Sequence, residues 1–282
     1  QYAKCSYEVC VGADETFFHD MLLVFMDLSS GYLFVEEASQ DRTYDTWKAH
    51  AQRRLRQVGM TVRYVVSDRA KALIKLATDG FECVSVPDLF HATREICKLF
   101  GARLHRRRQR LQNKLTNAAA QLALLQELKD VGPDAIGLQE EVMAQLRHDS
   151  QHITTGIETY TCLLHRISFC VHPFALSPAV RPVTSAHVAR ELHTVADALE
   201  ELREAYAITD TQKRLTKFTN QSDDLAIVID TWWQWVDDYL EPYDLGEEYT
   251  LWLRECLLPT LYWQIQTERT AQPDLQLQYN RA

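Results

Sequence analysis

The chain has 282 residues, 46% of them hydrophobic, and a formal net charge of −9. This length and apolar fraction are enough to bury a core in one large domain or two ordinary ones, which excludes a disordered chain. No apolar run approaches the roughly 20 residues of a membrane span and no signal peptide is recognisable, so we expect a cytoplasmic protein without a membrane partner. The seven cysteines lack the spacing of a disulfide framework and predict reduced thiols.

The first ninety residues alternate between strand and helix patterns. Aromatic and β-branched runs at 7–18 and 21–39 predict three antiparallel strands, because "SSG" at 29–31 divides the second run as a hairpin turn would. Further elements are predicted in the order helix, strand, helix, strand, at 43–59, 61–68, 69–80 and 81–88. The order β-β-β-α-β-α-β implies a mixed sheet with helices packed against it.

Beyond Asp88 the pattern becomes helical. Apolar positions at heptad-like spacing run through 89–130 and resume after "VGPDAIG" at 131–137, which predicts a long helical hairpin. A segment with three prolines, 172–185, is interpreted as a linker. Helices are then expected at 186–207, 223–240 and 247–268. The aromatic residues of the second of these favour core packing over base stacking, and they are Trp232, Trp233, Trp235 and Tyr239.

Charge is distributed unevenly along the chain. Residues 94–115 carry eight Lys or Arg against one acid, Glu95, whereas 190–255 carry sixteen acids against six basic residues. The basic stretch could be the solvated face of the hairpin, but so many cations over six helical turns favour contact with a phosphate backbone. The residues expected to contact DNA are Arg103, Arg106, Arg107, Arg108, Arg110 and Lys114.

Two carboxylates stand out by their positions. Asp14 lies inside the first predicted strand, where Asp is disfavoured, and Asp68 ends the fourth. The order of elements is that of the ribonuclease H-like fold, in which these strands are neighbours, so the two side chains would share Mg²⁺ or Mn²⁺. Alternatively, Asp68 is a helix N-cap and Asp14 faces water. Glu15 is a further candidate to lie near the site, although its side chain is expected on the opposite face from Asp14. Asp27 is best interpreted as a turn residue.

Four segments together resemble the catalytic domain of DDE-type bacterial insertion-sequence transposases. They are "GADET", "LLVFMDLSSGYLFVEE", "VVSDRAKAL" and "VPDLFHATREI", the last leading into a basic helix, and the resemblance covers roughly 7–110. It is closest to those members whose ribonuclease H-like core is interrupted by a helical insertion after the fifth strand. The resemblance implies that Asp14 and Asp68 are metal-binding catalytic acids. It also places Asp88 and His91 near the active site, although His91 could simply be packed.

The resemblance also implies a third catalytic acid, a Glu on a helix that follows the insertion. Several glutamates are candidates by position only, and each is more readily a solvated or capping residue: Glu241, Glu247, Glu248 and Glu255. Because "LLPTLYWQIQTERT" at 257–270 resembles a segment that precedes the catalytic Glu, we expect the chain to end inside the insertion, with the third acid beyond Ala282. A chain that ends there would be inactive by itself.

These inferences combine into an α/β core followed by an all-α region. The expected parts are a partial ribonuclease H-like core, a basic helical hairpin, a proline-containing linker and a helical insertion, at 1–92, 93–171, 172–185 and 186–282. The expected function is metal-dependent cleavage and transfer of DNA strands at transposon ends into target DNA, in a complex that could be homo-oligomeric. The alternatives are a nuclease of the same fold without strand transfer, and a catalytically inactive DNA-binding or assembly module.

Overall fold

The computed structural model describes residues 7–17, 19–128, 132–176 and 183–281, which group into two compact units. The sheet unit comprises Gln1–Ala92 with Asp223–Leu257, and the helical unit comprises Thr93–Ser222 with Leu258–Ala282. The mixed α/β class expected from the sequence is confirmed. The grouping of 223–257 with the sheet differs from the expectation that everything after 186 belongs to the insertion.

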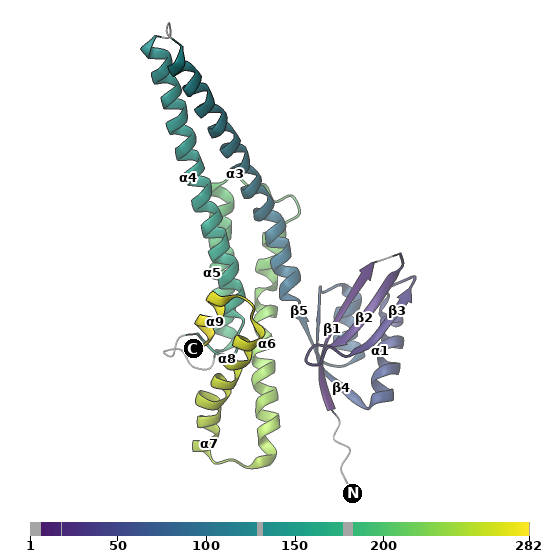
Figure 1. The fold of residues 1–282 in the computed structure, drawn as a ribbon. Coiled ribbons are helices and arrows are strands. Elements are labelled where there is room, and N and C mark those ends of the chain that lie inside the picture. Colours follow the sequence, from purple (N-terminus) through teal and green to yellow (C-terminus); the bar gives the residue numbers. More distant parts are fainter. Residues whose placement is uncertain (1–6, 18, 129–131, 177–182, 282) are drawn as a thin grey trace. The chain divides into compact units, whose positions relative to one another are not determined.

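The sheet unit is built on five strands in the spatial order β3-β2-β1-β4-β5. β1 pairs antiparallel with β2, and β2 with β3, whereas β4 is parallel to both β1 and β5. The predicted hairpin turn is confirmed, because Gly31 has φ of 74° and Asp27 accepts a hydrogen bond from the Ser30 amide. The strands are β1 (Tyr7–Phe17), β2 (Met21–Asp27), β3 (Leu33–Ser39), β4 (Met60–Ser67) and β5 (Val84–Pro87) (Figure 1).

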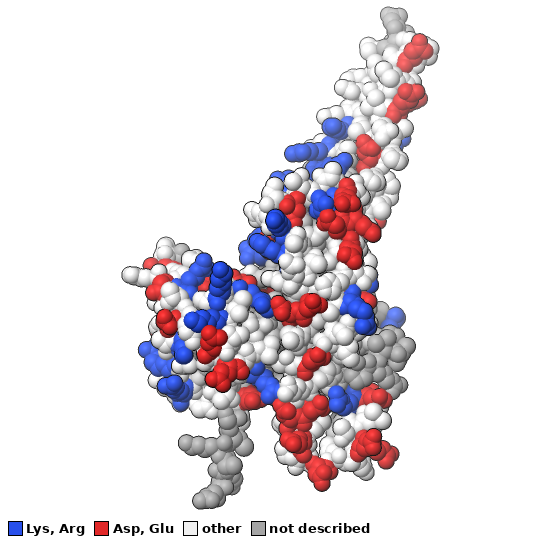
Figure 2. Space-filling view, turned by 180° about the vertical axis from the view of Figure 1, so that it is seen from behind, with Lys and Arg blue, Asp and Glu red and all other residues white. Residues whose placement is uncertain are grey.

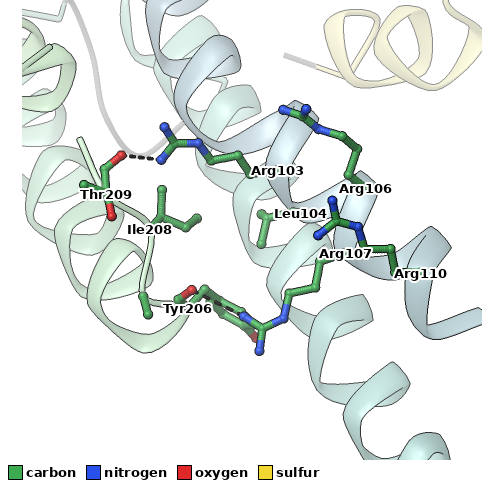
Figure 3. Close-up of a pocket in the computed structure, with 9 residues that line it drawn as sticks. Arg103, Leu104, Arg106, Arg107, Arg110, Tyr206, Ile208 and Thr209 are labelled. Carbon is green, nitrogen blue, oxygen red and sulfur yellow. Dashed lines mark hydrogen bonds between the residues drawn. The ribbon is translucent and has the colours of Figure 1, made fainter. Parts of the chain in front are cut away.

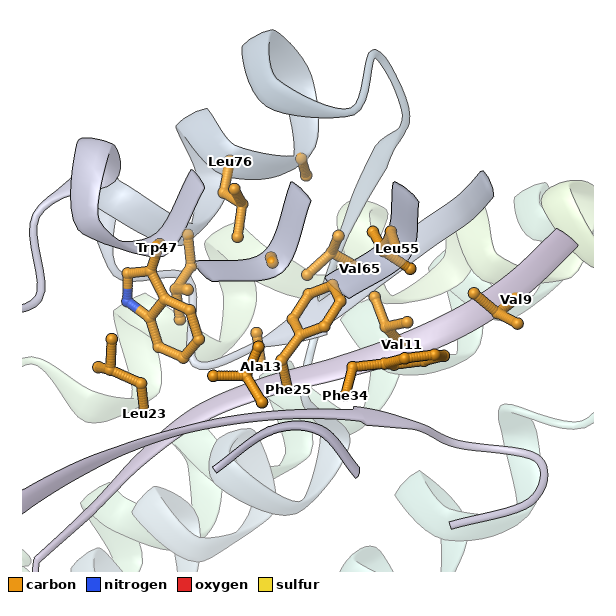
Figure 4. Close-up of a cluster of buried hydrophobic side chains, with 14 residues drawn as sticks. Val9, Val11, Ala13, Leu23, Phe25, Phe34, Trp47, Leu55, Val65 and Leu76 are labelled. Carbon is orange, nitrogen blue, oxygen red and sulfur yellow. The ribbon is translucent and has the colours of Figure 1, made fainter. Parts of the chain in front are cut away.

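One face of the sheet is covered by α1 (Tyr44–Val58) and carries the core of the unit. Thr43 caps the start of α1 by accepting from the Thr46 amide, and Gly59 ends it in the left-handed conformation, as the sequence predicted. Side chains of β1, β2, α1 and β4 meet in the cluster shown in Figure 4, where Phe25 and Trp47 are fully buried. The core therefore fixes which face of β1 each residue presents.

The segment between β4 and β5 differs from the single helix predicted at 69–80. It contains a short α2 (Lys71–Lys75) that continues as a π-helical turn, Leu76–Gly80. α2 starts late because Arg69 has φ of 63° and its N-cap is Ala70. The interpretation of Asp68 as a helix N-cap is therefore wrong.

The helical unit contains the predicted hairpin, formed by α3 (Leu89–Glu127) and α4 (Pro133–Cys170). Two contacts show the helices side by side: Phe100 stacks on Tyr160 at 5.8 Å between ring centroids, and Gln139 donates to the Ala118 carbonyl. Figure 1 shows the two long helices joined at one end. The proline-containing segment that follows is not a free spacer, because Phe174 and Val183 are buried, while 177–182 lie outside the described residues.

The helices after residue 185 differ from the three predicted, because the described residues there contain five α-helices. α6 starts nine residues earlier than predicted, and the helix predicted at 247–268 is divided by a π-helical turn. The elements are α5 (Ser185–Ala205), α6 (Arg214–Leu240), a 3₁₀ turn (Glu241–Tyr243), α7 (Glu247–Trp252), a π turn (Leu253–Leu257), α8 (Leu258–Arg269) and α9 (Pro273–Tyr279). Among the aromatic residues of α6, Trp233 is buried as expected, whereas Tyr239 is 67% exposed. The cysteines of the described segments are free thiols; Cys5 lies outside them.

Candidate functional site

The centre of the sheet brings Asp14 and Asp68 to the same edge. β1 and β4 are parallel, with Gly12 paired to Val66 and Ala13 paired to Ser67. The two acids come next, Asp14 within β1 and Asp68 one residue past the end of β4, so continuing the register places Asp14 opposite Asp68. Neighbouring strands lie about 4.8 Å apart, which is close enough for two carboxylates to interact strongly.

Each acid of this pair is held by a local backbone contact. Asp14 Oδ1 accepts from the Glu15 amide at 2.9 Å, and Asp68 Oδ1 accepts from the Ala70 amide at 2.8 Å. Both residues are exposed, on the face of β1 away from the buried Ala13. Within the described residues, the second oxygen of each has no hydrogen-bond partner. The two acids are therefore oriented by the backbone with one oxygen each available to a ligand.

Glu15 occupies a contrasting environment on the core-facing side of β1. Its side chain is 4% exposed, and Oε2 lies 3.4 Å from Arg42 Nη1, while Oε1 is buried without a hydrogen-bond partner in the described structure. Burial raises the pKa of the Glu15 carboxyl above its usual range, and the negative charge of Asp68 raises it further. The prediction that Glu15 and Asp14 point to opposite faces agrees with their burial.

Asp88 and His91 lie at the adjoining end of β5. The Asp88 amide donates to the Ser67 carbonyl at 2.7 Å, which ties this residue to the strand end that precedes Asp68. Both carboxylate oxygens of Asp88 are engaged: Oδ1 accepts from the Phe90 amide at 2.8 Å, and Oδ2 lies 2.7 Å from His91 Nδ1. Asp88 thus caps the start of α3 and orients His91, so it is less available to a metal than Asp14 or Asp68.

Asp14 and Asp68 together supply part of the ligand set that a divalent cation needs. Across the described segments, no group of three or more His, Cys, Asp or Glu is close enough to hold a metal ion. Asp14 and Asp68 supply the hard oxygen ligands that Mg²⁺ prefers, and such sites are usually completed by water and substrate phosphate. The glutamates considered as third acids do not join them: Glu241, Glu247 and Glu248 are exposed, and Glu255 lies in the π turn after α7.

Two arginines on β4 and its following loop pair with α6, which the sequence did not indicate. Arg69 Nη1 lies 2.8 Å from Asp224 Oδ2, and Arg63 Nη2 lies 2.6 Å from Asp238 Oδ2. The ion pair with Asp224 neutralises Arg69, which directly follows Asp68, whereas Arg63 lies in the first half of β4 and also contacts Glu8. Within the described residues, neither Asp14 nor Asp68 has an ion-pair partner. No local pattern could have revealed the two ion pairs with α6, because each joins residues more than 150 positions apart.

The predicted DNA-contacting residues lie on α3 in the helical unit, where they line two cavities. The larger, of 510 Å³, is shown in Figure 3 and is bounded by Arg103, Leu104, Arg106, Arg107, Arg110 and the turn Tyr206–Thr209 after α5. The smaller, of 320 Å³, is bounded by Arg107, Arg110, Leu111, Lys114 and three residues of α4, which are Asp149, His152 and Ile153. Arg108 lines neither cavity. The contribution of Tyr206–Thr209 was missed from the sequence.

Comparison of the chain with protein-family models, with curated proteins and with solved structures gives no match. None of the helices in the described segments combines the length and the apolar character needed to span a membrane. The function of the chain is therefore inferred from the geometry around Asp14 and Asp68 and from the basic residues of α3.

Proposed function

We propose that this chain is the catalytic region of a DDE-type transposase with a ribonuclease H-like core, which cleaves DNA strands with Mg²⁺ or Mn²⁺ and transfers the freed ends. The observation that carries the proposal is the parallel pairing of β1 with β4, whose last pair, Ala13 with Ser67, directly precedes Asp14 and Asp68. Each has an oxygen that remains available within the described structure.

The sheet topology supports the same family. A ribonuclease H-like sheet has its first and fourth strands adjacent at the centre, with the second and third strands antiparallel on one side and the fifth on the other. The order β3-β2-β1-β4-β5, with parallel β1-β4 and β4-β5 pairs, has this arrangement. The helical elements that follow β5 correspond to the insertion expected from the resemblance.

The roles of the residues follow from their charges and contacts. A divalent cation bound by Asp14 and Asp68 would activate water or a 3′-hydroxyl for in-line attack on a phosphodiester. Asp68 Oδ1 accepts a hydrogen bond from the Ala70 amide, which holds the carboxylate in one orientation. Binding of a cation would therefore cost little further side-chain entropy. Asp88 and His91 fix the neighbouring start of α3.

Asp68→Asn tests the proposal because asparagine keeps an oxygen for the Ala70 amide but removes the charge. We expect Mn²⁺ binding to this chain, measured by calorimetry, to fall at least tenfold. Strand cleavage by the complete protein should fall about 100-fold or more. The matched control is Asp45→Asn, an exposed acid in the first turn of α1, which should leave both measurements unchanged.

The outcomes separate the proposal from its alternatives. Unchanged cleavage by Asp68→Asn would remove the metal-binding role and overturn the proposal. A wild-type protein that cleaves DNA but never joins a 3′-hydroxyl end to a target would instead be a nuclease of the same fold. A wild-type protein that binds DNA but neither binds Mn²⁺ nor cleaves would be an inactive binding or assembly module.

A further inference from the structure

We propose that α3 carries a preorganised phosphate-binding strip that takes the sugar-phosphate backbone of DNA. The strip consists of Arg103, Arg106, Arg107, Arg110 and Lys114, together with the turn Tyr206–Thr209 that forms one wall. The choice of DNA as the partner rests on the proposed function, whereas the geometry belongs to the helical unit by itself.

The strip follows one face of α3. Positions 103, 107, 110 and 114 are spaced by three or four residues, which places their side chains on one side of a helix. Eleven residues at about 1.5 Å each give the strip a length of about 16 Å. The two cavities along it share Arg107 and Arg110, so they form one continuous basic surface. A single small anion would occupy only part of this length.

Two of the arginines are held by backbone carbonyl groups of the turn after α5, while Arg106 Nε donates to the Ala102 carbonyl within α3 at 2.8 Å. Arg103 Nη1 donates to the Thr209 carbonyl, and Arg107 Nη1 donates to the Tyr206 carbonyl at 3.4 Å, as the dashed lines in Figure 3 show. Each guanidinium has five N–H donors, so one carbonyl contact leaves several for phosphate oxygens. These contacts reduce the side-chain entropy that binding would otherwise cost.

The turn that supplies these carbonyls is itself anchored in the helical unit. The Tyr206 hydroxyl donates to the His152 carbonyl at 2.7 Å, and the two rings stack at 4.7 Å between centroids. Ile208 is buried, and its amide donates to the Arg203 carbonyl at 2.8 Å. The acceptors for Arg103 and Arg107 therefore have fixed positions.

The positive charge of the strip is not neutralised within the described part of the chain. No carboxylate lies within ion-pair distance of its five cations, whereas the nearby Arg203 and Arg214 pair with Glu200 and Glu95. Asp149 lines the smaller cavity, but its Oδ1 is engaged by Gln145 and His148. Figure 2 shows Lys and Arg gathered along one edge of the hairpin below its tip. The larger cavity is consequently the stronger anion site.

The test measures binding of a fluorescein-labelled 20-base-pair duplex by anisotropy over a range of salt concentrations. For Arg103→Gln combined with Arg107→Gln, we expect at least a tenfold weaker affinity near 100 mM salt. The salt slope should decrease by about 2, because each lost phosphate contact removes about 0.9. The charge-matched control is Arg147→Gln with Arg190→Gln, two exposed arginines that line neither cavity, which should change affinity less than about threefold.

A conservative double substitution controls for misfolding. Arg103→Lys with Arg107→Lys keeps the charge, so the salt slope should stay at the wild-type value while affinity falls only a few-fold. Wild-type affinity and slope in the glutamine pair would overturn the proposal. So would competition by inorganic phosphate at concentrations equal to the duplex phosphates, because the strip would then be a small-anion site.

The assay also distinguishes this inference from the proposed function. Asp68→Asn lies in the sheet unit and should bind the duplex as wild type does. If it also cleaves as wild type does, the catalytic proposal fails and the strip still stands. If instead Asp68→Asn abolishes cleavage while the glutamine pair binds DNA normally, the strip fails and the catalytic proposal stands.

Discussion

The two units of the molecule leave charges of opposite sign without partners. In the sheet unit, Asp224 of α6 neutralises Arg69, the residue that follows Asp68, while Asp14 and Asp68 have no ion-pair partner among the described residues. On α3 of the helical unit, the remaining charges are arginines, and the turn after α5 offers them neutral carbonyl oxygens. Like charges that lie close together repel one another, so such groups are informative about ligands of the opposite sign. The comparison indicates a cation for one unit and a polyanion for the other.

The largest expected effect is a loss of stability when the core of the sheet unit, which supports Asp14 and Asp68, is altered. Phe25→Ala removes a fully buried ring that contacts Phe34 and Phe81, so it should lower the unfolding free energy by about 3–5 kcal/mol. Because these contacts lie within the sheet unit, hydrogen exchange should increase across β1, β2 and α1. Equal loss of protection in α4 would contradict the division into two units.

The next effect concerns the pH dependence of the helical unit. Burial lowers the pKa of His172 from 6.5 to about 4, and its Nδ1 lies 2.5 Å from the Tyr262 hydroxyl. As the pH falls below 6.5, His172 binds a proton in the unfolded chain. In the folded chain, it binds a proton only near pH 4. Stability should therefore decrease over this window, by up to about 3 kcal/mol, and level off below it.

Urea denaturation at pH 7 and pH 4.5 checks this expectation with two variants. His172→Gln should remove most of the loss between the two pH values. His148→Gln replaces a histidine whose side chain is 77% exposed and should keep the wild-type dependence. Identical pH profiles for wild type and His172→Gln would contradict the expectation.

A smaller effect should follow from crowding the turn that holds Arg107. A Cβ on Gly156 would lie 2.4 Å from Tyr206 Cζ, so Gly156→Ala should destabilise the helical unit by about 1–3 kcal/mol and weaken duplex binding. Gly137→Ala is the matched control in the same helix, because nothing lies within 4 Å of its Cβ. The control should stabilise the protein slightly, by up to about 1 kcal/mol, through helix propensity. A thermal melt distinguishes the two directions.

The smallest effect expected is a gain in stability at the strand edge. Asp14→Asn removes one of two facing like charges while keeping an oxygen for the Glu15 amide, so it should add about 0.2–1 kcal/mol without metal. Millimolar Mg²⁺ should stabilise the wild type and leave the variant unchanged. A wild-type melting temperature that does not respond to Mg²⁺ would contradict this part of the comparison.

Sequence patterns predicted the strands because alternation and turn residues are local signals. The hairpin at Gly31, the caps of α1 and the positions of Asp14 and Asp68 follow from residues within a few positions of one another. The pairing of the two acids needed one further step, the order of the strands in the sheet. That step came from the succession of elements and agrees with the observed topology.

Several features that the sequence did not predict depend on distant contacts. Arg69 meets Asp224, and Arg103 meets the Thr209 carbonyl, across more than 100 positions in each case. The grouping of 223–257 with the sheet and the packing of Phe174 have the same origin. Such contacts produce no periodic pattern in the neighbouring sequence, so the sequence alone does not indicate them.

The irregular pairing of β1 with β4 limits how the chain can change in length. Val9 pairs with Val62 but Cys10 pairs with Tyr64, so Arg63 is an extra residue on β4. Deleting Arg63 would make the pairing regular and keep Asp68 aligned with Asp14. Deleting a residue between Tyr64 and Ser67 would instead move Asp68 opposite Ala13, whose side chain points to the other face of the sheet. Insertions in the turns at Gly31 or after α5 leave this alignment intact. During evolution, the interval from Tyr64 to Asp68 should therefore keep its length while the turns vary.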